Sequence, residues 1–178
     1  MWAAGPGGAA KVADDPALAA DRLAAEFRLA MRRTAAGVAI ITTRGPGAPS
    51  GITVSSFNSL SLEPPSVLAC VHGESRTLAA IVEAGVFAAN VLADHQSDLA
   101  EVFSGAASGE RRFDHGAWDE LRTGAPVLGG ALAAFDCRLA TTFGFGSHRI
   151  IVGEVLALRI AEAKPLLYHA RTYGRFGA

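Results

Sequence analysis

Two short polar segments carry the side chains that could bind a ligand. In the first, Gly51-Ile52-Thr53-Val54-Ser55-Ser56-Phe57-Asn58-Ser59, small and hydroxyl residues occupy an extended stretch. The two-residue period of a strand places Thr53 and Ser55 on one face, and Ile52, Val54 and Ser56 on the other. Taken alone, this segment is equally typical of an ordinary Thr/Ser-rich strand at the edge of a sheet.

The second segment, Glu74-Ser75-Arg76-Thr77, lies at the start of a predicted helix. Free backbone N–H groups, two hydroxyls and one guanidinium could hold a phosphate there. The same residues could also be a plain N-cap followed by a solvated arginine. Together, the polar strand and the helix start offer one place for a heterocycle and another for its phosphate tail. A flavin nucleotide has that shape.

Other chemistries lack their sequence signatures. The glycine-rich stretch from Gly45 to Gly51 opens a strand rather than a helix, so it does not fit a dinucleotide-binding loop. There is no P-loop, no His-Glu-x-x-His and no Gly-x-Ser-x-Gly motif. The five histidines are too scattered to predict a metal site, and we expect none. Cys70 and Cys137 form no Cys-x-x-Cys pair and are expected to be buried thiols.

Length and charge limit the class of protein further. The chain has 178 residues, 50% of them hydrophobic, with 16 basic and 17 acidic side chains and a formal net charge of −1. This composition predicts one compact domain and argues against a nucleic-acid partner. No secretion signal and no membrane-spanning stretch is recognisable. We therefore expect a cytoplasmic protein with a flexible leader over residues 1–15 and a single domain over 16–178.

The elements that must position the two polar segments are mostly short strands. A helix is predicted from Asp15-Pro16 to near Gly37, and a short one from Ser75 to Val82, ending at Gly85. Residues 104–124 are predicted to form a long surface excursion of the kind that often covers a site. The predicted strands are Val38–Thr43, Ile52–Ser56, Val67–Val71, Val86–Leu92, Leu132–Thr142 and His148–Ile160. This pattern favours a closed or nearly closed antiparallel barrel. The last strand is apolar on both faces, which predicts a homodimer.

An ordered series of motifs runs from Phe27 to Tyr173. The series comprises Gly37-Val38, Ile41-Thr42-Thr43, Gly51 to Ser59, Ser61 to Pro65, Ser75-Arg76-Thr77, Phe87 to Leu92, Arg112-Phe113 with Trp118, Gly124 to Leu128, Asp136-Cys137, His148 with Gly153-Glu154-Val155, and Pro165 to Tyr168 with Tyr173. In this order the motifs resemble the flavin reductase-like family. The resemblance implies a mainly β protein with a few helices, in the antiparallel, Greek-key FMN-binding split β-barrel. It also implies an NAD(P)H-dependent flavin reductase, the reductase component of a two-component flavin-dependent monooxygenase.

The resemblance further implies ligands and residue roles. FMN or FAD is the expected flavin, NADH or NADPH the co-substrate, and a flavin-dependent monooxygenase the transient partner. His148 is the implied catalytic residue, facing flavin and nicotinamide, although Ser147 stands where the family usually has an aspartate. The implied flavin-binding residues are Ser50, Gly51, Ile52, Thr53, Val54, Ser55, Ser56, Ser59, Cys70, Val71 and His72, with Ser75, Arg76 and Thr77 at the phosphate. Tyr168, His169 and Arg171 match a stretch implicated in nicotinamide nucleotide contact.

Hydride transfer between nicotinamide and flavin requires alignment rather than a strong acid or nucleophile, because the cofactor carries the difficult chemistry. We therefore expect residues 53–56 to orient the flavin and to donate hydrogen bonds near its N1 and C2 carbonyl. Three alternatives stay open from the sequence. They are a flavin-binding carrier or storage protein on the same barrel, an oxidase that keeps its flavin bound, and a structural interaction domain.

Overall fold

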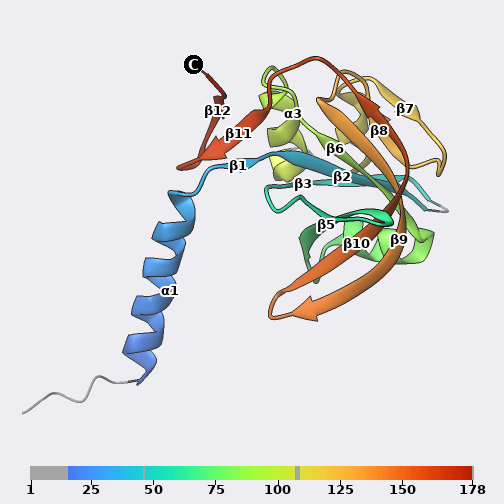
Figure 1. Cartoon of the computed structure of the whole chain (residues 1–178). Coiled ribbons are helices and arrows are strands. Elements are labelled where there is room, and N and C mark those ends of the chain that lie inside the picture. Colours follow the sequence, from blue (N-terminus) through green and yellow to red (C-terminus); the bar gives the residue numbers. More distant parts are fainter. Residues whose placement is uncertain (1–15, 46, 107–108, 178) are drawn as a thin grey trace, which may run out of the picture. The chain divides into compact units, whose positions relative to one another are not determined.

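The computed structural model describes residues 16–45, 47–106 and 109–177 (Figure 1). The chain divides into two compact units, residues 1–34 and residues 35–178. The described part of the first unit contains helix α1, Pro16–Arg32. The predicted leader and the predicted cap Asp15 lie outside the described residues. The helix ends earlier than predicted, because Ala36–Gly37 instead forms strand β1, which pairs with β11.

Within the second unit, seven antiparallel strands form one sheet in the order β3-β2-β6-β9-β10-β5-β4 (Figure 1). Two small sheets, β1-β11-β12 and β7-β8, complete the strands described. The bounds of the strands after β1 are β2 Ala39–Arg44, β3 Pro49–Val54, β4 Asn58–Leu62, β5 Pro65–His72, β6 Val86–Val91, β7 Trp118–Glu120, β8 Pro126–Leu128, β9 Ala133–Phe145, β10 His148–Ile160, β11 Leu166–His169 and β12 Thr172–Arg175. The prediction of a mainly β protein with antiparallel pairing is therefore confirmed.

The helices of the second unit are short. Helix α2, Arg76–Ala84, ends on Gly85, whose φ of 69° is the left-handed conformation that glycine adopts most readily. Helix α3, Ser97–Glu101, continues into a π-helical turn, Val102–Ala106, and a 3₁₀ segment follows at Gly109–Asp114. The predicted short helix and its glycine stop are thus confirmed, within the usual one or two residues at the start and end.

Strand β2 is buried on both faces, which accounts for the lack of alternation from Val38 to Thr43. Ile41 packs into a core between the strands of the large sheet, together with Phe87 and Ile151. Ile40 packs on the opposite side into a second core, together with Phe103. A strand buried on both faces gains from apolar residues at every position, so its sequence does not alternate.

The large sheet is split where β3 approaches β5. In the part of the chain that is described, β3 pairs along its length with β2 alone, and no ladder joins it to β5. Just after the end of β3, the Ser56 hydroxyl instead donates to the Cys70 carbonyl of β5 and accepts from the Cys70 N–H, both at 3.0 Å. An unpaired strand edge exposes backbone donors and acceptors to whatever lies beside it. This seam agrees with a split barrel.

The predicted surface excursion over residues 104–124 is only partly correct. Phe113 and Trp118 pack with Phe103, which is fully buried, at ring-centroid distances of 5.1 and 5.4 Å. The strand β7 also begins at Trp118. These three aromatic residues have irregular spacing, so their packing carries no periodic signal in the sequence. The cluster fixes this segment against the barrel.

Candidate functional site

Three cavities follow one another along β3, and the largest lies at the start of α2. This helix-start cavity has a volume of about 860 Å³. Its lining includes Ser50 and Gly51 from β3, Ser75, Arg76 and Thr77 from the helix start, Arg112 from the 3₁₀ segment, His72 and Glu74. The predicted phosphate-binding residues therefore line one cavity together with the start of β3.

The local structure at the helix start leaves it open to an anion. Ser75 occupies the N-cap position, but its hydroxyl makes no capping hydrogen bond within the described chain. The first turn of α2 contains no acidic residue, and Arg76 is exposed there. Free N–H groups at a helix N-terminus carry a partial positive charge, which attracts an anion. On the barrel side, the Thr77 and Ser50 hydroxyls hydrogen-bond each other at 2.9 Å and join the helix to β3.

Arg112 is a cavity residue to which the sequence analysis assigned no role. Its Nη1 donates to the Gly51 carbonyl oxygen at 3.0 Å, across 61 positions in the sequence. The Arg112-Phe113 motif was recognisable in the sequence, but nothing in its spacing connects it to β3. The cavity therefore has arginines on two sides, with the Glu74 carboxylate and the His72 imidazole also at its lining.

The second cavity lies in the seam between β3 and β5. This β3–β5 cavity has a volume of about 310 Å³ and is lined by Ile52, Thr53, Val54, Ser55, Ser56, Cys70, Val71, His72 and His148. The structure thus brings together the predicted ring-binding strand, the predicted flanking strand and the predicted catalytic histidine. Ile52 and His72 also line the helix-start cavity, so the two cavities are neighbours.

His148 and His72 lie directly opposite each other on β10 and β5. Their rings meet edge to face, with centroids 5.4 Å apart. His72 accepts the Glu74 backbone N–H at its Nδ1, and the Nδ1 of His148 is 2.9 Å from the Ser147 hydroxyl. Ser147 therefore contacts the imidazole nitrogen that a neighbouring aspartate could hold. A neutral hydroxyl orients the ring without the charge stabilisation that a carboxylate gives.

Two of the predicted hydrogen-bond donors, one on β3 and one just after it, are already used within the fold. Thr53 donates its hydroxyl proton to the Ala100 carbonyl at 2.8 Å, and Ser56 links β3 to Cys70. The Ser55 side chain is exposed. The backbone N–H groups of β3 and the Ser55 hydroxyl are therefore the better candidates for binding a ring. Cys70 is half-buried, which contradicts its predicted burial, because it faces this cavity rather than the core.

A third cavity, of about 220 Å³, shares Thr53, Val54 and Ser55 with the second. Tyr168 and Tyr173 line it, with ring centroids 5.3 Å apart across the β11–β12 pair. Burial raises the pKa of Tyr173, and Tyr168 and Glu101 add to this effect. The phenol is therefore kept protonated, as a hydrogen-bond donor, to higher pH than usual.

Three predicted residues do not line the three cavities described. Ser59 lies on the edge strand β4 opposite Val67. His169 and Arg171 are exposed at the β11–β12 turn, where Ala170 and Arg171 have φ values of 50° and 68°. Their ligand contacts stay predictions.

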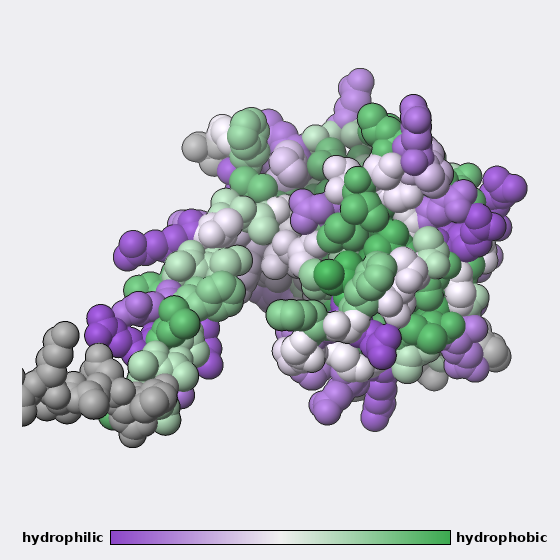
Figure 2. All heavy atoms as spheres, turned by 60° about the horizontal axis from the view of Figure 1, so that its bottom comes forward, coloured by the Kyte–Doolittle hydropathy of each residue, from purple (hydrophilic) through white to green (hydrophobic). Residues whose placement is uncertain are grey.

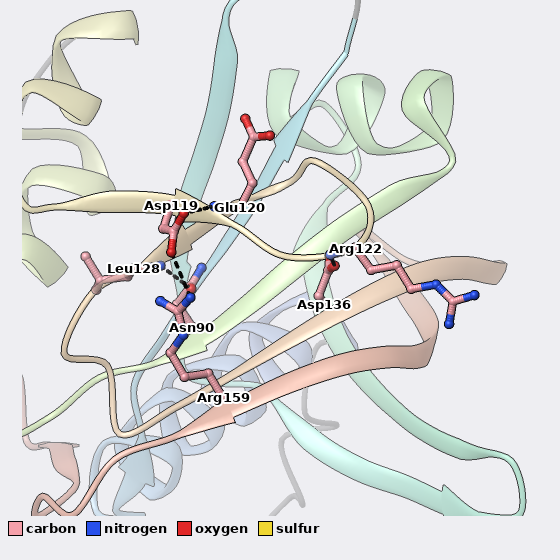
Figure 3. A network of polar contacts seen from close by, with 7 residues as sticks. All are labelled: Asn90, Asp119, Glu120, Arg122, Leu128, Asp136 and Arg159. Carbon is pink, nitrogen blue, oxygen red and sulfur yellow. Dashed lines mark hydrogen bonds and ion pairs between the residues drawn. The ribbon is translucent and has the colours of Figure 1, made fainter.

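A second set of polar contacts lies in the interior, on the β7–β8 side of the sheet (Figure 3). Asp136 accepts the backbone N–H groups of Arg122 and Thr123 at 2.7 and 2.8 Å and also the Thr123 hydroxyl. Asn90 accepts the Leu128 N–H at 2.8 Å and donates to the Ile40 carbonyl at 3.1 Å. These groups fix the chain between β7 and β9. They line none of the three cavities.

Two further pKa shifts concern residues that line none of the three cavities. Burial, and then the Asp136 charge, raise the pKa of the Cys137 thiol to about 12. The hydrogen bond from Arg159, followed by the Glu120 backbone N–H, lowers the pKa of Asp119. Over the described residues, no group of three or more His, Cys, Asp or Glu side chains could hold a metal ion. No helix there is long and apolar enough to cross a membrane.

Comparison with known proteins identifies the class to which this site belongs. Residues 31–177 match the flavin reductase like domain, so the chain belongs to the flavin reductase-like family. The resemblance recognised in the sequence is therefore confirmed.

Particular relatives agree with this assignment. The chain is 40% identical over 151 residues to an FMN reductase (NADH) RutF 1 of Methylorubrum extorquens, covering 84% of this chain and 75% of that protein. It is similar in structure to flavin reductase PheA2, with a TM-score of 0.79, 34% identity and coverage of 89% and 99%. BorF, the flavin reductase component of a bacterial two-component tryptophan halogenase, has a TM-score of 0.79, 32% identity and coverage of 85% and 97%.

Proposed function

We propose that this protein is an NAD(P)H:flavin oxidoreductase, which transfers a hydride from NADH or NADPH to FMN or FAD. The observation that carries the proposal is the continuity of two chemically different cavities along β3. The helix-start cavity has the cations and free N–H groups that suit a phosphate. The β3–β5 cavity beside it has an unpaired strand edge and apolar side chains that suit a flat ring.

The residues present fit a flavin nucleotide in this orientation. Its ring carries alternating donors and acceptors along one edge, which an unpaired strand edge can match as it would match another strand. Ile52 and His72 border both cavities, so a ligand lying past them can occupy both at once. Their volumes, about 860 and 310 Å³, are within the range of small-molecule sites.

When bound, the flavin supplies the hydride-accepting chemistry. The chain contributes binding and orientation. Backbone N–H groups of β3 would hold the ring edge where negative charge develops. His148, oriented by Ser147, would form the side of the β3–β5 cavity against which the nicotinamide is seated. Tyr168 in the adjoining cavity is a candidate for contact with the nicotinamide nucleotide.

We further propose that the protein is a cytoplasmic homodimer that releases reduced flavin to a flavin-dependent monooxygenase. Large apolar side chains at both ends of the β9–β10 pair are exposed: Phe143 and Phe145 at one end, and Leu158 and Ile160 at the other. Figure 2 shows apolar side chains gathered on a face of the second unit. Exposed apolar surface of this kind favours a protein partner, and a second copy is the simplest one. Light scattering tests this directly, since a stable monomer at micromolar concentration contradicts the dimer.

The activity is tested by following NADH and NADPH oxidation anaerobically, with FMN, with FAD and without flavin. We expect oxidation only when a flavin is added, with repeated turnover of free flavin. Flavin-independent oxidation, or none with either flavin, would contradict the proposal. A tightly bound flavin that neither nucleotide bleaches would instead indicate a carrier or storage protein. A stable yellow protein that does not turn over free flavin would indicate a bound-flavin oxidase.

A further inference from the structure

We propose that the third cavity binds the adenine ring of NADH or NADPH, and that the Tyr173 ring is the surface on which the adenine stacks. The inference rests on the proposed function, because it places one part of the proposed co-substrate. The cavity has a volume of about 220 Å³, which is enough for one ring system but too small for a whole dinucleotide.

The lining of the third cavity suits an uncharged ring rather than a phosphate. Its described lining residues are valines, hydroxyl residues and two tyrosines, and none of them carries a charge at neutral pH: Val38, Thr53, Val54, Ser55, Ser104, Tyr168 and Tyr173. A phosphate would lose water there without gaining a cationic partner. A nucleobase is planar and uncharged, and it stacks favourably on an aromatic side chain.

The two tyrosine rings are held in place by the fold. Tyr168 on β11 lies directly opposite Tyr173 on β12, and both rings pack against the core that contains Val38 and Leu166. The Leu166 N–H donates to the Leu92 carbonyl at 3.0 Å, and the Val38 N–H donates to the Leu166 carbonyl at 3.2 Å. These bonds attach the small sheet to the barrel. A platform that is already ordered costs little entropy when a ligand binds to it.

Tyr173 is the better placed of the two tyrosines. In the small sheet β1-β11-β12, Tyr168 is on the central strand and Tyr173 is on an outer one, so Tyr173 has a neighbouring strand on one side only (Figure 1). Because burial raises the pKa of Tyr173, its phenol also stays a hydrogen-bond donor. Ring nitrogens of adenine are acceptors for such a donor.

The position of the cavity identifies the nucleotide that supplies the base. The third cavity shares Thr53, Val54 and Ser55 with the β3–β5 cavity, but it shares no lining residue with the helix-start cavity. The adenine of FAD would extend from the phosphate in the helix-start cavity, away from Tyr173. The nicotinamide is proposed to lie in the β3–β5 cavity, against the flavin ring. The second ring of that same nucleotide is therefore the one within reach of the third cavity.

The first test compares NADH with reduced nicotinamide mononucleotide, which has the same reacting ring but no adenine. KM values are measured anaerobically with FMN for wild type, Tyr173→Leu, Tyr173→Phe and the matched control Phe176→Leu. Phe176 is an exposed aromatic residue just after β12 that lines none of the three cavities.

We expect Tyr173→Leu to raise the KM for NADH about tenfold, as for the loss of one stacked base, and the KM for the mononucleotide less than about twofold. Tyr173→Phe keeps an aromatic face and should stay within about threefold of wild type for NADH. Phe176→Leu should match wild type with both substrates.

The second test requires neither turnover nor a variant. Tyr168 and Tyr173 are the only tyrosines of the chain, so nitration by tetranitromethane, located by mass spectrometry, reports on this cavity alone. We expect ADP-ribose, which has the adenine but no nicotinamide, to protect Tyr173 in the flavin-loaded wild-type protein. Nicotinamide mononucleotide should give no protection. Thermal melting verifies that the variants are folded, and the nitration result decides if Tyr173→Leu does not fold.

Each contrary outcome has its own meaning. Equal rises in KM for NADH and the mononucleotide would place the nicotinamide in the third cavity and overturn the adenine assignment. Weaker binding of FAD than of FMN to Tyr173→Leu, with an unchanged KM for NADH, would assign the cavity to FAD and also overturn it. An active protein whose Tyr173 is not protected by ADP-ribose would overturn the assignment alone. A wild-type protein that oxidises neither NADH nor NADPH with either flavin would overturn the proposed function, and the assignment with it.

Discussion

Polar groups are used in opposite ways at two places in the barrel. Around Asp136 and Asn90, each carboxylate and amide is matched by donors and acceptors of the chain itself. Asp136 is fully buried, and two backbone N–H groups and one hydroxyl take the place of a counter-ion within the described chain. Among the described residues, no buried side-chain nitrogen or oxygen is without a partner.

At the helix-start cavity, some polar side chains are not matched in this way. The Ser75 hydroxyl does not cap α2 in the described structure, and Arg76 is exposed at the cavity lining. A buried polar group without a hydrogen-bond partner destabilises the folded state, so the interior of a stable fold pairs nearly all of its polar groups. Open donors around a cavity bind water until a ligand replaces it. The contrast separates the polar residues that hold this fold from those that we expect to bind.

The largest effect that follows from this contrast concerns stability. Asp136→Ala leaves the N–H groups of Arg122 and Thr123 buried without an acceptor, so we expect the free energy of unfolding to fall by about 3 kcal/mol. The matched variant is Asp119→Ala, which removes an exposed carboxylate from its contact with Arg159 and should change stability little. Urea unfolding measures both. Equal effects would mean that the Asp136 contacts contribute no more than a surface ion pair.

The reverse pattern is expected at the cavity. Arg76→Ala should raise the KM for FMN about ten- to a hundredfold, because it removes a charged contact made equally in the ground and transition states. Stability should not change, since Arg76 is exposed. Arg159→Ala, at the opposite end of β10 from His148, removes a positive charge far from the cavity and serves as the control. A similar rise in KM for both variants would indicate a long-range charge effect rather than a phosphate contact.

Local signals in the sequence were sufficient to predict the main strands of the barrel, and the resemblance to the family predicted much of the β3–β5 cavity. Alternation and apolar runs predicted β5, β9 and β10, and glycine after an amphipathic stretch predicted the end of α2. The family's motif order then brought together residues 52–56, 70–72 and 148, which do line one cavity.

What could not be predicted depends on contacts between distant parts of the chain. Arg112 reaches Gly51 across 61 positions, and Phe103 approaches the same glycine from another element. Neither contact has a spacing that a sequence pattern could detect. The hydrogen bonds from the Thr53 and Ser56 hydroxyls to the Ala100 and Cys70 carbonyls could not be predicted for the same reason. The short strands β7, β8, β11 and β12 were not predicted, because three or four residues are too few to show a clear period.

The two cysteines allow the cavity and the interior to be compared by chemical modification. Cys70 is half-buried at the β3–β5 cavity, whereas Cys137 is buried and its pKa is raised to about 12, so its reactive thiolate is scarce. We expect a small alkylating reagent to modify Cys70 in the native protein and to leave Cys137 unmodified. Saturating FMN should slow the modification of Cys70 about tenfold, as expected when a ligand occupies the site for nine-tenths of the time or more. Mass spectrometry of the peptides distinguishes the two sites.

Undiminished alkylation of Cys70 in the presence of FMN would mean that the ring does not occupy the β3–β5 cavity. Cys70→Ser provides the matched control, since it should abolish the FMN-sensitive modification. It preserves the backbone N–H and carbonyl through which Ser56 links the two strands.

The smallest effect is expected at His148, which is exposed and which we propose to seat the nicotinamide. His148→Ala should raise the KM for NADH by about three- to tenfold and change FMN binding little, because it removes one contact at the side of the ring cavity. Ser147→Ala keeps the imidazole but removes the hydroxyl 2.9 Å from its Nδ1, and should produce a smaller change in the same direction. Steady-state kinetics with each substrate varied in turn separates the two constants. Equal loss of NADH use and flavin binding would mean that His148, in edge contact with His72, supports the rim of the barrel and not the nicotinamide.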